Sequence, residues 1–165
     1  MKRRLLPFIA AVVALALIAN GAVAAPSAVR TTGHERVVPN AMVQATLRFT
    51  PGKVGLSSGD EVTFTDDDAQ AAPHTATIVE EFPGATLEEI FGCGAPTEPC
   101  GLALAAHAVS GPVVDVGEPG FNEPGDSLFF GQGGTISAEV TAPAGTKLKY
   151  LCAIHPWMQG QITVR

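Results

Sequence analysis

Short runs in which apolar and polar residues alternate constrain the fold of this chain more than any other feature. Residues 136–140, 147–152 and 161–164 each follow this pattern and are separated by turn residues. A period of two predicts strands with one buried face. Since the 18 glycines and 13 prolines are spread along the chain, about seven short strands joined by turns are expected. The sequence therefore predicts an all-β fold, an antiparallel sandwich of two packed sheets.

The first half of the chain adds further strands and a long interruption. Residues 43–49 alternate as one half-buried strand, residues 62–64 begin a second, and residues 74–78 place His74 on the inner face of a third. Residues 85–91 have the pattern of one or two helical turns. The stretch 83–125 is rich in Gly and Pro, and is interpreted as a long irregular insertion before the last strands.

The N-terminus has the composition of an export signal. Three basic residues, 2–4, precede an apolar stretch at 5–19, and Ala22-Val23-Ala24 supplies small residues for cleavage. We expect a signal peptide over 1–25, a linker over 26–40 and a domain over 41–165. The protein would then be periplasmic, extracellular or attached to the cell surface, with no stable membrane span in the mature chain. An uncleaved anchor is the alternative reading of residues 1–25.

Charge narrows the class of partner. The chain has 16 acidic and 10 basic residues, and the predicted leader holds 3 of the basic ones, so the rest has a net charge near −9. Phosphates would repel such a domain, which argues against nucleic-acid binding and favours a basic partner. Residues 66–68, 80 and 81 are acidic and flank the strand of His74. We interpret them as a solvated edge, with a docking patch as the alternative.

Three cysteines in an exported chain leave one that needs an explanation. Cys93 and Cys100 are separated by six residues that include Gly94, Pro96 and Pro99, so we predict a disulfide that closes a small loop within the insertion. Cys152 is the odd cysteine.

Cys152 lies in a short loop with two further metal-ligand residues. His155 and Met158 follow at regular spacing between two predicted strands, and His74 can supply a second imidazole from its own strand. One thiolate, two imidazoles and a weak thioether are the ligands of a blue-copper site. The sequence therefore predicts that His74, Cys152, His155 and Met158 bind one copper ion. The alternatives are a buried structural thiol at Cys152 and a core-packing role for Met158.

The motifs Ala-Pro-His-Thr at 72–75 and Cys-Ala-Ile-His-Pro-Trp-Met at 152–158 resemble those of cupredoxins of the plastocyanin and amicyanin type. The resemblance covers about 41–82 and 126–165. It implies a Greek-key sandwich with one type 1 copper per chain that carries single electrons and is not an enzyme. It also implies that His155 is the more exposed ligand and that redox partners dock around His155 and Trp157.

One departure from the family pattern concerns the residue after His74. Many cupredoxins have an Asn there that ties the two ligand loops together, whereas this chain has Thr75. The tie is therefore expected to be weaker, or to be made by the hydroxyl group.

Three other functions fit parts of the sequence. A copper storage or delivery protein would be richer in Met than this chain, which has 3. A relative of multicopper oxidases or nitrite reductases would need His-x-His pairs, and the sequence contains none. A sandwich without copper that serves in adhesion is the third alternative.

Overall fold

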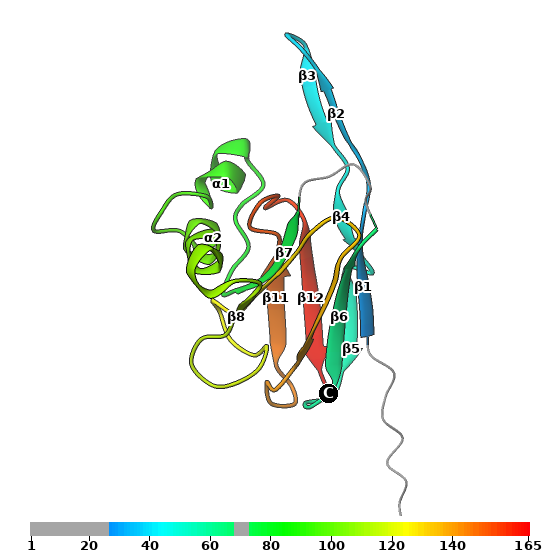
Figure 1. The fold of residues 1–165 in the computed structure, drawn as a ribbon, viewed down its shortest axis with the longest axis vertical. Helices are drawn as coiled ribbons and strands as arrows, with labels where there is room; N and C mark the ends of the chain where they lie inside the picture. The colour runs from blue at the N-terminus through cyan, green and yellow to red at the C-terminus, as the bar shows by residue number, and fades with distance from the viewer. Residues whose placement is uncertain (1–26, 68–72) are drawn as a thin grey trace, which may run out of the picture.

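The computed structural model describes residues 27–67 and 73–165, which form two packed β-sheets with two helices beside them (Figure 1). The four-stranded sheet has the order β10 (Thr135–Glu139), β6 (Glu61–Asp66), β1 (Ser27–Thr32), β4 (Arg48–Thr50). The six-stranded sheet has the order β5 (Lys53–Leu56), β12 (Gln159–Val164), β11 (Lys147–Leu151), β7 (His74–Val79), β9 (Ser127–Phe130), β8 (Val113–Val114).

The predicted all-β sandwich is confirmed, with a correction to its pairing. Most neighbouring strands are antiparallel, including β7 with β11 and β11 with β12. The two exceptions are β1 with β6 and β12 with β5, which are parallel. Parallel neighbours need a connection longer than a hairpin, which is why local turn patterns did not reveal them.

Aromatic side chains from both sheets meet in the core. Phe64 of β6 is fully buried and makes edge contacts with Tyr150 of β11 and Phe49 of β4. Edge-to-face arrangements of this kind suit the charge distribution of aromatic rings. Gly160 of β12 faces Tyr150 so closely that a Cβ atom would lie 2.3 Å from its ring. Glycine is therefore required at position 160, because the ring of Tyr150 occupies the space of a side chain.

The insertion is more regular than its composition predicts. Helix α1 (Leu87–Gly92) confirms the expected helical turns and begins with a capping box between Thr86 and Glu89. Helix α2 (Pro99–Ser110) was not predicted. The expectation of an irregular insertion is therefore wrong over these residues. Proline in the first turn suits a helix start, because its missing N–H group has no partner there.

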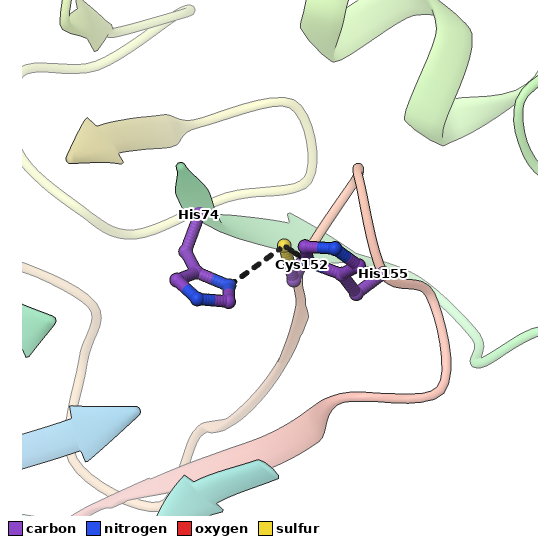
Figure 2. Close-up of side chains that lie close together, drawn as sticks. All are labelled: His74, Cys152 and His155. Atoms are coloured by element: carbon purple, nitrogen blue, oxygen red, sulfur yellow. Dashed lines mark hydrogen bonds between the residues drawn. The ribbon is translucent and has the colours of Figure 1, made fainter. Parts of the chain in front are cut away.

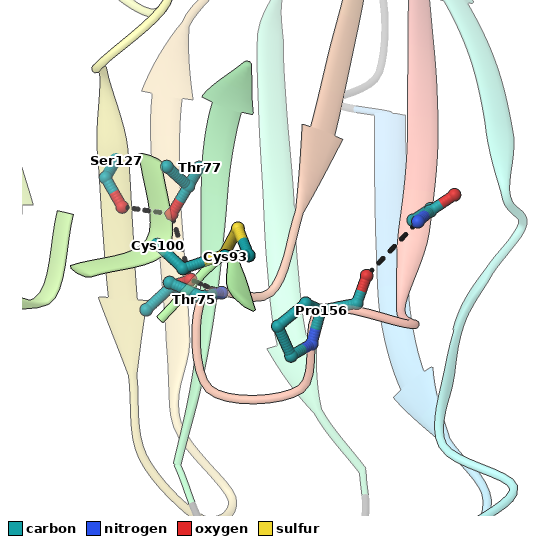
Figure 3. Close-up of a disulfide and its surroundings, with 8 residues drawn as sticks. Thr75, Thr77, Cys93, Cys100, Ser127 and Pro156 are labelled. Atoms are coloured by element: carbon teal, nitrogen blue, oxygen red, sulfur yellow. Dashed lines mark hydrogen bonds between the residues drawn. A yellow bond between two sulfur atoms is a disulfide. The ribbon is translucent and has the colours of Figure 1, made fainter. Parts of the chain in front are cut away.

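The insertion covers the outer face of the six-stranded sheet. The predicted disulfide between Cys93 and Cys100 is present, with an S–S distance of 2.01 Å (Figure 3). Both cysteines and Ala103 pack with Val79 of β7 and Leu151 of β11 in a second apolar cluster. As a result β7 is buried along its whole length, as expected for a strand covered on both faces.

The N-terminal prediction needs two corrections. Residues 27–32 were expected in a linker, yet they form β1 between β4 and β6, with Val29 fully buried. Residues 43–49 were expected to form one half-buried strand. Instead β2 (Glu35–Val38) and β3 (Met42–Ala45) pair in a separate two-stranded arm, where Val43 is 74% exposed. Of the predicted inner face, Leu47 and Phe49 are buried, whereas Val43 is exposed because it belongs to the arm and not to a sheet of the sandwich.

Within 27–67 and 73–165, neither helix has the length and apolar character needed to cross a membrane. The predicted signal peptide, residues 1–25, lies outside the described residues.

Candidate metal centre

The sandwich brings the predicted ligand residues to one end of the six-stranded sheet. His74 is the first residue of β7, whereas Cys152, His155 and Met158 occupy the loop between β11 and β12. Two backbone hydrogen bonds fold this loop on itself: Cys152 N donates to Met158 O at 3.0 Å, and Met158 N donates to His155 O at 2.8 Å. The short spacing in the sequence thus becomes a compact turn.

Three donor atoms converge in this turn. The Sγ of Cys152 lies 3.7 Å from Nδ1 of His74 and 3.6 Å from Nδ1 of His155 (Figure 2). One ligand atom from each of the three residues lies within 4.8 Å of those from the other two. His74 and Cys152 are fully buried, and His155 is 5% exposed. His155 is therefore the more exposed imidazole, as expected, but only by a narrow margin.

Met158 is completely buried and belongs to the same apolar cluster as Cys152. Its backbone hydrogen bonds to Cys152 and His155 place it at the base of the loop. Met158 as a thioether ligand stays a prediction.

Cys152 belongs to the apolar core, and the two imidazoles and a few hydrogen-bond donors lie beside its sulfur. Burial raises the pKa of its thiol, although hydrogen bonds from the backbone act in the opposite direction. Thr75 N donates to Cys152 Sγ at 3.4 Å. Since a metal binds the thiolate, such a donor stabilises the charged form that binding requires.

The tie between the two ligand segments is made by a hydroxyl group. Ala153 N, the residue after Cys152, donates to Thr75 Oγ1 at 2.7 Å. The hydroxyl of Thr75 therefore does connect the His74 strand to the Cys152 loop, one of the two outcomes expected from the sequence.

Each imidazole also has a carboxylate on the side away from Cys152. Asp66 Oδ1 lies 3.9 Å from Nε2 of His74, and Glu35 Oε1 lies 3.7 Å from Nε2 of His155. Carboxylates placed behind metal-binding histidines commonly fix which nitrogen faces the metal. The arrangement leaves both Nδ1 atoms directed at the sulfur.

Sequence reasoning missed both carboxylates. Asp66 was assigned to a solvated edge but is 2% exposed, and its Oδ1 accepts a hydrogen bond from Thr31. Asp66 follows Phe64 by two residues, so the alternation of the strand already predicted that its side chain lies on the inner face. Glu35 was assigned to the linker, where no pattern pointed to His155.

An apolar groove adjoins the His155 side of the centre. The ring of Trp157 lies 5.2 Å from that of His155 and 6.3 Å from that of Phe91. Trp157, Phe91 and Leu87 line the groove together with Val43 of the arm, around a volume of about 850 Å³. The predicted docking region is thus hollowed rather than flat.

The other two histidines lie elsewhere. His34 hydrogen-bonds Thr46 at the base of the arm, and His107 of α2 hydrogen-bonds Ser127 of β9. Neither belongs to the cluster with Cys152.

No family model matches the chain, and no curated protein matches it. Among solved structures, the purple cupredoxin of Nitrosopumilus maritimus is 19% identical, with 84% of this chain and 99% of that chain covered and a TM-score of 0.45. Amicyanin from Paracoccus versutus is 16% identical, with 86% and 83% covered and a TM-score of 0.41. Cupredoxins are thus among the structural neighbours.

A larger enzyme is also among the similar structures. The copper-containing nitrite reductase of Thermus scotoductus is 19% identical, with 86% of this chain and 22% of that chain covered and a TM-score of 0.43. The chain spans less than a quarter of that protein.

The donor set itself fits one copper ion. A thiolate with two imidazoles, all buried and converging, suits copper in both of its common oxidation states. The apolar shell around them limits the access of water, which controls the potential of such a site.

Proposed function

We propose that this protein is an exported type 1 copper protein that carries single electrons between redox partners. The observation that carries the proposal is the convergence of Cys152 Sγ with Nδ1 of His74 and of His155 at a buried site. Cys152 would supply the thiolate, His74 and His155 the two imidazoles, and Met158 a weak thioether that tunes the potential.

Copper bound at this site would supply a one-electron redox couple. The chain's own residues provide the conditions for fast transfer. Backbone hydrogen bonds hold the loop of Cys152, and Thr75 ties it to β7. Because the donors are buried and fixed, little rearrangement accompanies a change in charge. An electron carrier converts no substrate, so the proposal includes no catalytic turnover.

The electron partner docks on the face around His155 and Trp157. This face holds the imidazole nearest the surface and the apolar groove, and Glu35 lies beside it. The net negative charge of the chain favours a partner with a basic surface.

Export is supported by two features. The composition of residues 1–25 is that of a signal peptide, and the disulfide between Cys93 and Cys100 is of a kind that persists in oxidising compartments. In this proposal the mature domain begins ahead of β1, because β1 is a central strand of its sheet.

Titration of the purified, metal-free protein with Cu(II) tests the function. We expect an intense blue or purple colour at one copper per chain that bleaches reversibly on reduction. Cys152→Ser should abolish the colour, whereas Ser137→Ala, on an exposed position of β10, should retain it. Binding of Cu(I) alone, with no colour from Cu(II), would favour storage or delivery instead. Reduction of nitrite by the copper-loaded protein would favour an enzyme.

A further inference from the structure

A line of hydrogen bonds connects the metal centre to the helical insertion. It starts at Ala153 N, which donates to Thr75 Oγ1. Thr75 Oγ1 lies 3.0 Å from Thr77 Oγ1, which lies 2.7 Å from Ser127 Oγ (Figure 3). Ser127 Oγ is 2.8 Å from Nε2 of His107, on helix α2. We call this set the hydroxyl chain.

The far end of the hydroxyl chain is fixed by the backbone. Nδ1 of His107 lies 2.8 Å from the carbonyl oxygen of Gly111, at the end of α2. A carbonyl oxygen only accepts, so Nδ1 must carry the proton and donate. In the neutral ring, Nε2 is then an acceptor and receives the hydrogen bond of Ser127.

The remaining directions follow from His107. Ser127 donates its one hydroxyl proton to Nε2, so it accepts from Thr77, and Thr77 in turn accepts from Thr75. At the near end Thr75 Oγ1 accepts from the N–H group of Ala153, which can only donate. Every hydroxyl accepts once and donates once in the same direction. Such ordered networks strengthen each member and hold one arrangement.

The register of the sheet explains why these groups meet. Thr75 and Thr77 share the face of β7 opposite His74, which is the face covered by the insertion. Thr77 pairs with Ser127 across β7 and β9. The ring of His107 lies 5.5 Å from that of Phe129, which holds it over the same strand. The three hydroxyl residues are buried and His107 is half-buried.

We propose that His107 is a positioning residue for the metal centre, and that it acts through Ser127, Thr77 and Thr75 on the sulfur of Cys152. Thr75 contacts the site twice, through its N–H group on Sγ and its hydroxyl on the residue after Cys152. A change in the orientation of Thr75 therefore changes the hydrogen bonding of the sulfur, which tunes the potential of such centres. This gives the insertion a role in the proposed electron transfer, on which the inference rests.

The protonation of His107 is the first test. In metal-free protein, ¹⁵N NMR of the neutral imidazole should show the Nδ1–H form. Predominance of the Nε2–H form would overturn the direction of the hydroxyl chain and with it the proposal.

A double-mutant cycle between His107→Phe and Thr75→Val tests the coupling. Phe keeps the ring contact with Phe129 but accepts no hydrogen bond. In copper-loaded protein, we expect His107→Phe to change the ratio of Cu(II) to Cu(I) affinity about threefold, or about 28 mV at 59 mV per tenfold change. In protein that already carries Thr75→Val, His107→Phe should cause no further change in this affinity ratio. Val109→Thr, on the exposed side of α2, is the matched control and should leave the ratio unchanged.

The same cycle in metal-free protein separates this inference from the proposed function. The chemical shift of the Ala153 amide proton reports its hydrogen bond to Thr75, and His107→Phe should move it upfield. Ser127→Ala breaks the same line and replaces His107→Phe if that variant fails to fold. If the protein binds no copper but shows the amide shift, the proposed function is wrong and this inference stands. If the protein is blue but the effects of His107→Phe and Thr75→Val on the affinity ratio are additive, or the amide shift is unchanged, this inference is wrong and the proposed function stands.

Discussion

The helical insertion and the β2–β3 arm both extend the sandwich near the metal centre, but they are attached to it in different ways. The insertion is closed by a disulfide, packs Cys100 and Ala103 into an apolar cluster, and reaches Thr75 through hydrogen bonds. The arm projects from the sandwich (Figure 1) and exposes Val43 and Val37.

This difference indicates how each region can influence the centre. Buried hydrogen bonds and packed side chains have few alternative positions, so a change in the insertion is transmitted to the site. The arm reaches an imidazole through the carboxylate of Glu35, which is 33% exposed at its side chain. Its influence is therefore electrostatic and subject to screening by salt.

Loss of the disulfide should have the largest effect on stability. Replacing both Cys93 and Cys100 with Ala opens a loop with a sequence separation of 7, which corresponds to about 2.5 kcal/mol of unfolding free energy in the chain-entropy account. Urea unfolding of the metal-free variant measures it. Wild-type protein with its disulfide reduced is the control, since it keeps the side-chain volume. An unchanged midpoint in both samples would show that the insertion is held by packing alone.

The second largest effect is expected from neutralising the buried carboxylate of Asp66, which should weaken copper binding. Asp66→Asn keeps an acceptor for Thr31 but removes a negative charge 3.9 Å from His74 Nε2. Substitutions behind metal-binding histidines lower affinity by about 10- to 100-fold. Cu(II) should lose more affinity than Cu(I), because it carries more charge, so the reduction potential should rise. Competition with a chelator and a redox titration measure the two effects.

Neutralising Glu35 on the arm should weaken copper binding less than the change at Asp66, and its effect should depend on salt. Glu35→Gln is expected to lower Cu(II) affinity by less than about tenfold, because solvent screens a partly exposed carboxylate. Raising the ionic strength from 0.01 M to about 1 M should shrink the effect of Glu35→Gln while leaving that of Asp66→Asn nearly constant. Equal salt dependence for both variants would contradict the proposed difference between the regions.

The smallest change in stability and copper binding should come from an exposed valine of the arm. Val43→Thr replaces a side chain that is 74% exposed, and surface substitutions of this type stay within about 0.5 kcal/mol. Thermal unfolding and the copper spectrum should both match those of the wild type. A large loss of stability would show that the arm packs against the domain in solution.

The sequence predicted that most of these side chains lie together because the information for this is local. Cys152, His155 and Met158 lie within one loop, so their spacing alone brings them close. The alternation of β11 places Leu148 and Tyr150 on the inner face, as predicted, and the disulfide closes a short loop. His74 could be assigned by its face and by the need for a second imidazole.

The contacts that only the tertiary structure decided join segments far apart in the chain. Strand β1, whose residues the sequence assigns to a linker, pairs in parallel with β6. Asp66 meets His74, and Glu35 of the arm meets His155. His107 reaches Thr75 through Ser127, which is 20 residues from His107 and 50 from Thr77 in the sequence. Periodicity fixes which way a side chain faces along its own strand, but the partner across the sheet depends on how the whole chain packs.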